Sequence, residues 1–139
     1  MSRGRKPSPS GRLEQRHQDF VRTVPLRQMH PHLAEVRVKL EFQDGSPQPP
    51  SPQSFCYFPA ARGFFRYSCP CFACTGEFDL TDRVAQLARR KGGLERSDSL
   101  EVNCEGQRSR EVNEPAPCPM RARVVIEAVA HSKENRDGV

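Results

Sequence analysis

Residues 33–44 of this chain contain a strict alternation of apolar and charged residues, from Glu35 to Phe42. Every second position from Val36 to Phe42 is apolar, and charged residues stand between them. A period of two is typical of a β-strand that buries one face and exposes the other. Weaker versions of the pattern cover residues 100–104 and residues 121–131. The pattern therefore predicts at least three strands of a sheet with one solvated face.

Two further elements are predicted between these strands. Residues 64–68 are rich in aromatic side chains and are predicted to form a strand. Residues 82–91 are predicted to form a helix, because Thr81 is a suitable N-cap and Val84 and Leu87 belong to one apolar stripe. The order of elements favours an α+β fold, with a small and mostly antiparallel sheet and one helix.

Composition limits the size of the core. The chain has 139 residues, of which 35% are hydrophobic, and 13 prolines. Its mean hydropathy is −0.74. Such a chain has room for one small domain, which commonly needs a metal ion or disulfides for stability. The expected segments are a disordered basic tail (residues 1–12), a poorly defined arm (13–32), one α+β domain (33–131) with a proline-rich loop (46–54), and a disordered tail (132–139).

Six cysteines supply the candidate chemistry, and three of them lie within residues 69–74. No apolar stretch after the N-terminus is typical of a signal peptide, and no run approaches the roughly 20 apolar residues that span a membrane. We therefore expect a cytoplasmic protein without a membrane partner. In that reducing compartment, clustered cysteines are more often metal ligands than structural disulfides.

The cysteine spacing predicts a four-thiolate zinc site. Cys71 and Cys74 have the CxxC spacing that chelates one Zn²⁺, and Gly76 allows the tight turn that follows. Cys104 ends one predicted strand and Cys118 precedes the next, so a hairpin would bring both thiols to the same end of the sheet. We expect these four cysteines to bind Zn²⁺ and to stabilise the domain.

This arrangement resembles a zinc ribbon over about residues 66–120. The resemblance rests on a thiolate pair at a turn and a second pair on a later hairpin. It departs from the ribbon pattern because the second pair is not a CxxC, and because a helix intervenes. It implies a structural metal site and no particular partner.

Several alternatives stay open at this point. Cys69 is a substitute ligand for one of the four thiols, and a histidine is another (His30, His32 or His131). A zinc ion with four thiolates carries a formal charge of −2, which nearby arginines are expected to offset (Arg66, Arg121 or Arg123).

Three functions remain after these observations. The first is a non-enzymatic, zinc-stabilised protein-interaction module with an unknown protein partner, since a closed site offers no position for a substrate. The second is a nucleic-acid-associated regulator, because residues 1–40 contain nine Lys/Arg against three acids. The third is a thiol–disulfide redox protein. It is disfavoured because the predicted helix begins several residues after the CxxC motif, so its N-terminus cannot lower the thiol pKa.

Overall fold

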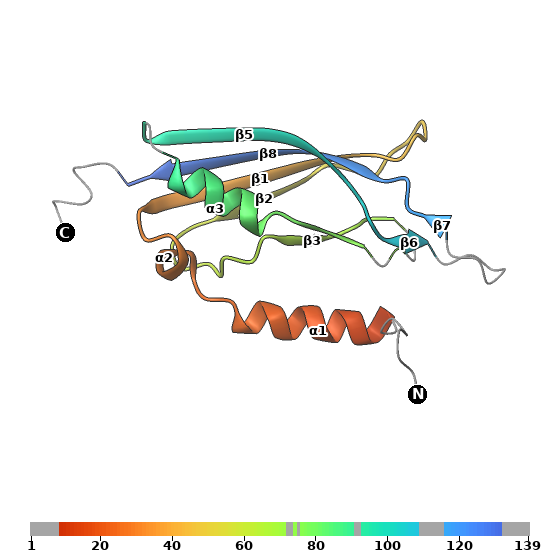
Figure 1. The fold of residues 1–139 in the computed structure, drawn as a ribbon, viewed down its shortest axis with the longest axis horizontal. Helices are drawn as coiled ribbons and strands as arrows, with labels where there is room; N and C mark the ends of the chain where they lie inside the picture. The colour runs from red at the N-terminus through yellow and green to blue at the C-terminus, as the bar shows by residue number, and fades with distance from the viewer. Residues whose placement is uncertain (1–8, 72–73, 75, 91–92, 109–115, 132–139) are drawn as a thin grey trace.

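The computed structural model describes residues 9–71, 74, 76–90, 93–108 and 116–131 (Figure 1). The described residues contain three helices: α1 (Pro9–Arg22), α2 (Leu26–Met29) and α3 (Thr81–Arg89). They also contain eight strands: β1 (Leu33–Gln43), β2 (Gln53–Tyr57), β3 (Arg66–Ser68), β4 (Glu77–Asp79), β5 (Glu95–Asn103), β6 (Gln107–Arg108), β7 (Ala116–Pro117) and β8 (Arg121–Ala130). The α+β class is confirmed, but the expectation of a single helix is wrong. Residues 1–8 of the tail expected over 1–12, and all of the tail expected over 132–139, lie outside the described residues.

The largest sheet in the described residues has the strand order β2-β1-β8-β5, and each neighbouring pair is antiparallel. Val38 of β1 lies opposite Phe55 of β2 and Ile126 of β8, so these side chains share one face. The apolar residues of β1 and β8 are buried on that face, as the alternating sequence pattern predicted. β5 starts at Glu95, five residues before the expected strand. Its first half was missed because its residues are all polar and lie at the edge of the sheet.

A second layer covers the buried face of the sheet (Figure 1). It consists of α3 and a short hairpin, in which β3 pairs with β4. The hairpin is joined to the helix by Leu80, whose backbone N–H donates to the Phe65 carbonyl at 2.8 Å. The side chains between the two layers are fully or almost fully buried: Phe65, Phe78, Leu80, Val84 and Leu87.

The start of α3 differs in detail from the prediction. Thr81 is the first residue of the helix instead of its N-cap, and Leu80 occupies the N-cap position. The Asp79 carboxylate accepts hydrogen bonds from the Thr81 backbone N–H at 3.0 Å and from the Thr81 hydroxyl at 2.6 Å. A carboxylate at this end also complements the helix dipole.

α1 occupies part of the segments that were expected to be disordered or poorly defined. It packs below the β3 layer (Figure 1), where the Phe20 and Phe64 rings meet edge to face with centroids 5.5 Å apart. Asp19 accepts a hydrogen bond from Arg66 Nη1 at 2.8 Å. These contacts join residues more than 40 positions apart, so the local pattern of residues 9–22 could not reveal them. α1 ends before Pro25, which precedes α2.

Candidate metal centre

Four cysteine sulfurs meet at one end of the molecule. The Sγ atoms of Cys69, Cys74, Cys104 and Cys118 all lie within 4.8 Å of one another. The Cys69–Cys118 sulfurs are 3.8 Å apart and the Cys74–Cys104 sulfurs are 3.6 Å apart. Both distances are much longer than the disulfide bond of about 2.05 Å. Among the described residues, this is the one group of side chains with the geometry of a metal site.

Two hairpin ends supply the four sulfurs. Cys69 and Cys74 lie between β3 and β4, and Cys104 and Cys118 lie between β5 and β8. The β5–β8 pairing extends through Cys104, whose N–H donates to the Met120 carbonyl at 2.9 Å. The hairpin from which the second cysteine pair was inferred is therefore present.

The two hairpin ends have the same backbone pattern. Cys69 N–H donates to the Gly76 carbonyl at 3.1 Å, and Cys118 N–H donates to the Gly106 carbonyl at 3.0 Å. The pairing of β3 with β4 continues outward through the first of these bonds. The strand register thus places Cys69, the residue next to β3, at the start of the turn. Cys74 lies on the returning arm of the same turn. Each hairpin presents one thiol from each of its two arms.

Backbone amides donate to the sulfurs in a repeated way. The N–H groups of Gly76 and Gly106 donate to the Sγ atoms of the cysteines two residues before them, both at 3.3 Å. The N–H groups two residues after the other two cysteines, in Cys71 and Met120, donate to those sulfurs as well. A hydrogen bond to an ionised group favours its charged form, so all four turns are shaped to stabilise thiolates.

The two glycines allow the hairpin ends to come this close. A Cβ atom on Gly106 would overlap the backbone nitrogen of Gly76 and would lie 2.9 Å from Cys74 Sγ. A Cβ atom on Gly76 would overlap Cys104 Sγ. Each glycine therefore lies against the opposite hairpin end, and any side chain at either position would push the two cysteine pairs apart.

Burial opposes ionisation of the thiols when no cation is bound. It raises the pKa of Cys69 above its ordinary value and raises the pKa of Cys104 to about 12. Burial acts on Cys118 in the same direction, but the hydrogen bonds from Met120 and the neighbouring cysteines keep the pKa of Cys118 below its ordinary value. Four buried thiolates need a compensating positive charge, which a divalent metal ion would provide.

Three of the four expected ligands belong to the group of four sulfurs. Cys71 does not; Cys69, which was left open as a substitute, stands in its place. The physical reason is the register of the β3–β4 hairpin, which directs Cys69 toward Cys118 and leaves the Cys71 backbone amide to donate to Cys69 Sγ. The histidines named as alternatives do not belong to this group: His30, His32 and His131.

The sequence contained a signal that identifies these four residues. Cys74-x-Gly76 recurs as Cys104-x-Gly106, and the Cys-Pro pair at Cys69 recurs at Cys118. Like residues meet in the structure: the sulfurs of the two Cys-Pro cysteines are 3.8 Å apart, and those of the two Cys-x-Gly cysteines are 3.6 Å apart. The CxxC spacing concealed this repeat, and the role of Gly106 was missed.

The arginines expected beside the site have other partners. Arg66 pairs with Glu77 at 2.7 Å and with Asp19, and Arg123 lies 3.8 Å from Glu101. Arg121 is exposed at the start of β8. The donors that the structure places on the four sulfurs are therefore backbone amides and not these arginines.

The geometry fits a single tetrahedral metal ion. Zn–S bonds of about 2.3 Å in a regular tetrahedron place the sulfurs about 3.8 Å apart. The Cys69–Cys118 and Cys74–Cys104 distances of 3.8 and 3.6 Å agree with this value, and all four sulfurs lie within 4.8 Å of one another. A cluster of several iron ions would spread its thiolates farther apart, because they bind different metal ions. Three of the four cysteines are at most 7% exposed, so the site is enclosed.

No protein-family model, no curated protein and no solved structure matches this chain. In the part of the chain that the structure describes, no helix has the length and apolar character needed to cross a membrane. The function is therefore argued from the chemistry of the site.

Proposed function

We propose that this chain is a small zinc-binding protein without catalytic activity, in which the metal stabilises a protein-interaction domain. The observation that carries the proposal is the convergence of four cysteine sulfurs from two hairpin ends, each sulfur with a backbone N–H donor. Zinc sites with four thiolates are structural, because all four coordination positions are filled and none remains for water or substrate.

The position of the site explains what the metal would stabilise. It would join the β3–β4 hairpin of the second layer to the β5–β8 hairpin of the main sheet. The two hairpin ends already touch through Gly76 and Gly106, which have no side chains to pack against each other. Zinc would supply that link, in a chain whose hydrophobic share is only 35%. A site of four thiolates is also best maintained in a reducing compartment, which supports a cytoplasmic location.

A thiol–disulfide function is less well supported. The Cys71-x-x-Cys74 motif is followed by β4, and α3 begins only at Thr81, so the helix N-terminus is not placed to lower the pKa of either thiol. Cys74 instead lies beside Cys104.

Metal removal tests the proposed function. The purified chain should lose its metal to a strong chelator and lose thermal stability at the same time. A ligand at about 1,000 times its dissociation constant stabilises the folded state by about 4 kcal/mol. Adding back Zn²⁺ should restore the melting temperature, whereas Mg²⁺ should not. A chain with the same melting curve with and without chelator would refute the proposal.

A further inference from the structure

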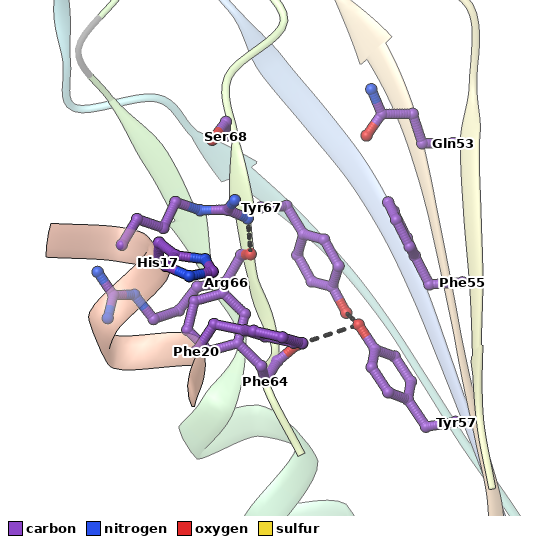
Figure 2. A pocket seen from close by; sticks show the side chains of 10 residues that line it. His17, Phe20, Gln53, Phe55, Tyr57, Phe64, Arg66, Tyr67 and Ser68 are labelled. Atoms are coloured by element: carbon purple, nitrogen blue, oxygen red, sulfur yellow. Dashed lines mark hydrogen bonds between the residues drawn. The ribbon is translucent and has the colours of Figure 1, made fainter. Parts of the chain in front are cut away.

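A cleft of about 560 Å³ lies between β2, the 64–68 segment and α1, away from the cysteine site (Figure 2). Gln53, Phe55 and Tyr57 of β2 point into it from one side. Phe64, Arg66, Tyr67 and Ser68 face them, and α1 adds Arg16, His17 and Phe20. The volume is within the range of about 300–1,000 Å³ that is usual for ligand sites.

The strands that flank the cleft are each paired on one side only. In the described residues β2 pairs only with β1, and β3 pairs only with β4. The Tyr57 and Tyr67 hydroxyls are 2.6 Å apart and close one end of the cleft, while Gln53 and Ser68 line the opposite end (Figure 2). An unpaired strand edge offers backbone donors and acceptors to an extended peptide.

The two edge strands of the main sheet differ in how they are protected. β5 carries four charged residues in nine (Glu95, Arg96, Asp98 and Glu101), which is a common protection against pairing with another chain. β2 is Gln-Ser-Phe-Cys-Tyr and carries none. The edge beside the cleft is therefore the one that is open to strand addition.

Exposed apolar side chains gather on the same side of the molecule. The described residues include six large hydrophobic side chains that are exposed, and five belong to α1, β2 or the segments directly after them: Phe20, Val21, Val24, Phe55 and Phe58. The segments after α1 and β2 are themselves joined, since Gly63 N–H donates to the Val24 carbonyl at 2.9 Å. An exposed apolar patch with a polar rim is typical of protein-interaction sites.

The charges at the rim favour an acidic partner. Arg16 lies over the Phe64 ring at 5.2 Å, and Arg62 lies over the Phe20 ring at 5.6 Å. Arg66 pairs with Asp19 and Glu77, and Arg16 Nε also lies 3.9 Å from Glu77. With the exposed Arg62, three arginines thus face two acids. Carboxylates of a partner would therefore meet arginines at the rim without an equal number of competing acids.

We propose that this cleft binds an extended acidic segment of a partner protein. It is here called the β2 cleft and is lined by Gln53, Phe55, Tyr57, Phe64 and Tyr67, together with Arg16, His17 and Phe20 of α1. The segment adds a strand to the free edge of β2, seats apolar side chains on the exposed aromatic rings and places carboxylates near Arg16 and Arg62. This inference rests on the proposed interaction function and names its surface and the chemistry of its partner.

Peptide selection on the full, zinc-loaded chain tests the proposal. Phage-displayed random octapeptides are selected, and the recovered sequences are synthesised and measured by fluorescence anisotropy. We expect them to contain Asp or Glu together with large apolar residues. N-methylation should weaken binding about tenfold at every second peptide position and have little effect at the positions between, because alternate amides of an added strand bond to β2.

Matched variants locate the binding surface. Phe55→Ser should weaken binding about tenfold, as expected for an aromatic anchor. Leu94→Ser removes another exposed large hydrophobic side chain, which lies outside the β2 cleft, and should have no effect. If Phe55→Ser fails to fold, variants of His17, an exposed residue that lines the cleft, test the same surface. His17→Glu should weaken binding of an acidic peptide about threefold, and His17→Lys should strengthen it.

Three outcomes would overturn the proposal. One is selected peptides that bind Phe55→Ser and His17→Glu as well as the original chain. Another is a uniform effect of N-methylation. The third is a failure to select peptides, whether or not a 12-nucleotide single-stranded RNA binds in a Phe55-dependent manner. Zinc content is measured on every sample by native mass spectrometry. A zinc-loaded chain that selects no peptide refutes this inference alone, whereas a metal-free folded chain refutes the proposed function.

Discussion

A single methyl group at Gly106 should disrupt the metal site. In Gly106→Ala the new Cβ would overlap the Gly76 nitrogen, lie 2.5 Å from the Gly76 Cα and lie 2.9 Å from Cys74 Sγ. Carbon atoms prefer separations of about 3.5 Å or more, so the two hairpin ends would have to separate by about 1 Å. The obstacles are backbone atoms and a cysteine sulfur of the group of four, which cannot swing aside as a long flexible side chain does.

The size of the effect follows from this overlap. Extra methyl groups in well-packed sites cost about 1–3 kcal/mol. If that cost applies to the metal-bound state, zinc affinity should fall about 5- to 150-fold. Gly93→Ala is the matched control, since a Cβ there meets nothing within 4 Å. It should change stability by less than about 0.5 kcal/mol.

Competition against a chromophoric zinc chelator at pH 7.5 measures both variants under the same conditions. The account predicts weaker binding for Gly106→Ala and unchanged binding for Gly93→Ala. An affinity of Gly106→Ala within twofold of the original chain would refute the role assigned to the glycine contact.

Three further predictions concern ligands, helix docking and protons. Cys69→Ser should lower zinc affinity at least about tenfold while Cys71→Ser leaves it within threefold, measured by the same competition assay; the reverse order would contradict the ligand set. Arg66→Met should increase amide exchange throughout α1, whereas Arg123→Met, which removes an exposed pair at 3.8 Å, should not; equal exchange in both variants would contradict the anchoring role. Because burial raises the pKa of Cys104 to about 12 and also that of Cys69, zinc binding at pH 7 should release two or more protons, and affinity should fall as pH falls. Calorimetry in buffers of different ionisation enthalpy measures this number, and release of fewer than two protons would contradict the thiol assignment.

Much of the sheet could be predicted from local patterns. β1 and β8 alternate apolar and polar residues because one face is buried and the other solvated, and this period is visible in a single sequence. The same reasoning predicted that Cys104 and Cys118 lie at the same end of the sheet, because two adjacent antiparallel strands bring their connected ends together. The alternation of residues within each strand was therefore sufficient to predict these two strands and the face that each one buries.

The remaining features depend on contacts between distant residues. α1 is held by Arg66 and Phe64, which lie more than 40 positions later in the chain. The position of Cys69 in the group of four sulfurs depends on the register of the β3–β4 hairpin, whereas the CxxC spacing favours Cys71, which does not belong to that group. The repeated Cys-Pro and Cys-x-Gly sequences would have selected Cys69 instead of Cys71, because turns of equivalent sequence place their sulfurs in equivalent positions.

Native mass spectrometry of the chain, purified from cells without added zinc, tests the central claim most directly. The account predicts one zinc ion per folded chain, with a mass lower than the sum of chain and metal because thiol protons are displaced. It also predicts that the zinc content per chain is unchanged in Cys71→Ser and lower in Cys69→Ser. A folded chain without metal, or with a metal that is indifferent to Cys69, would contradict the account.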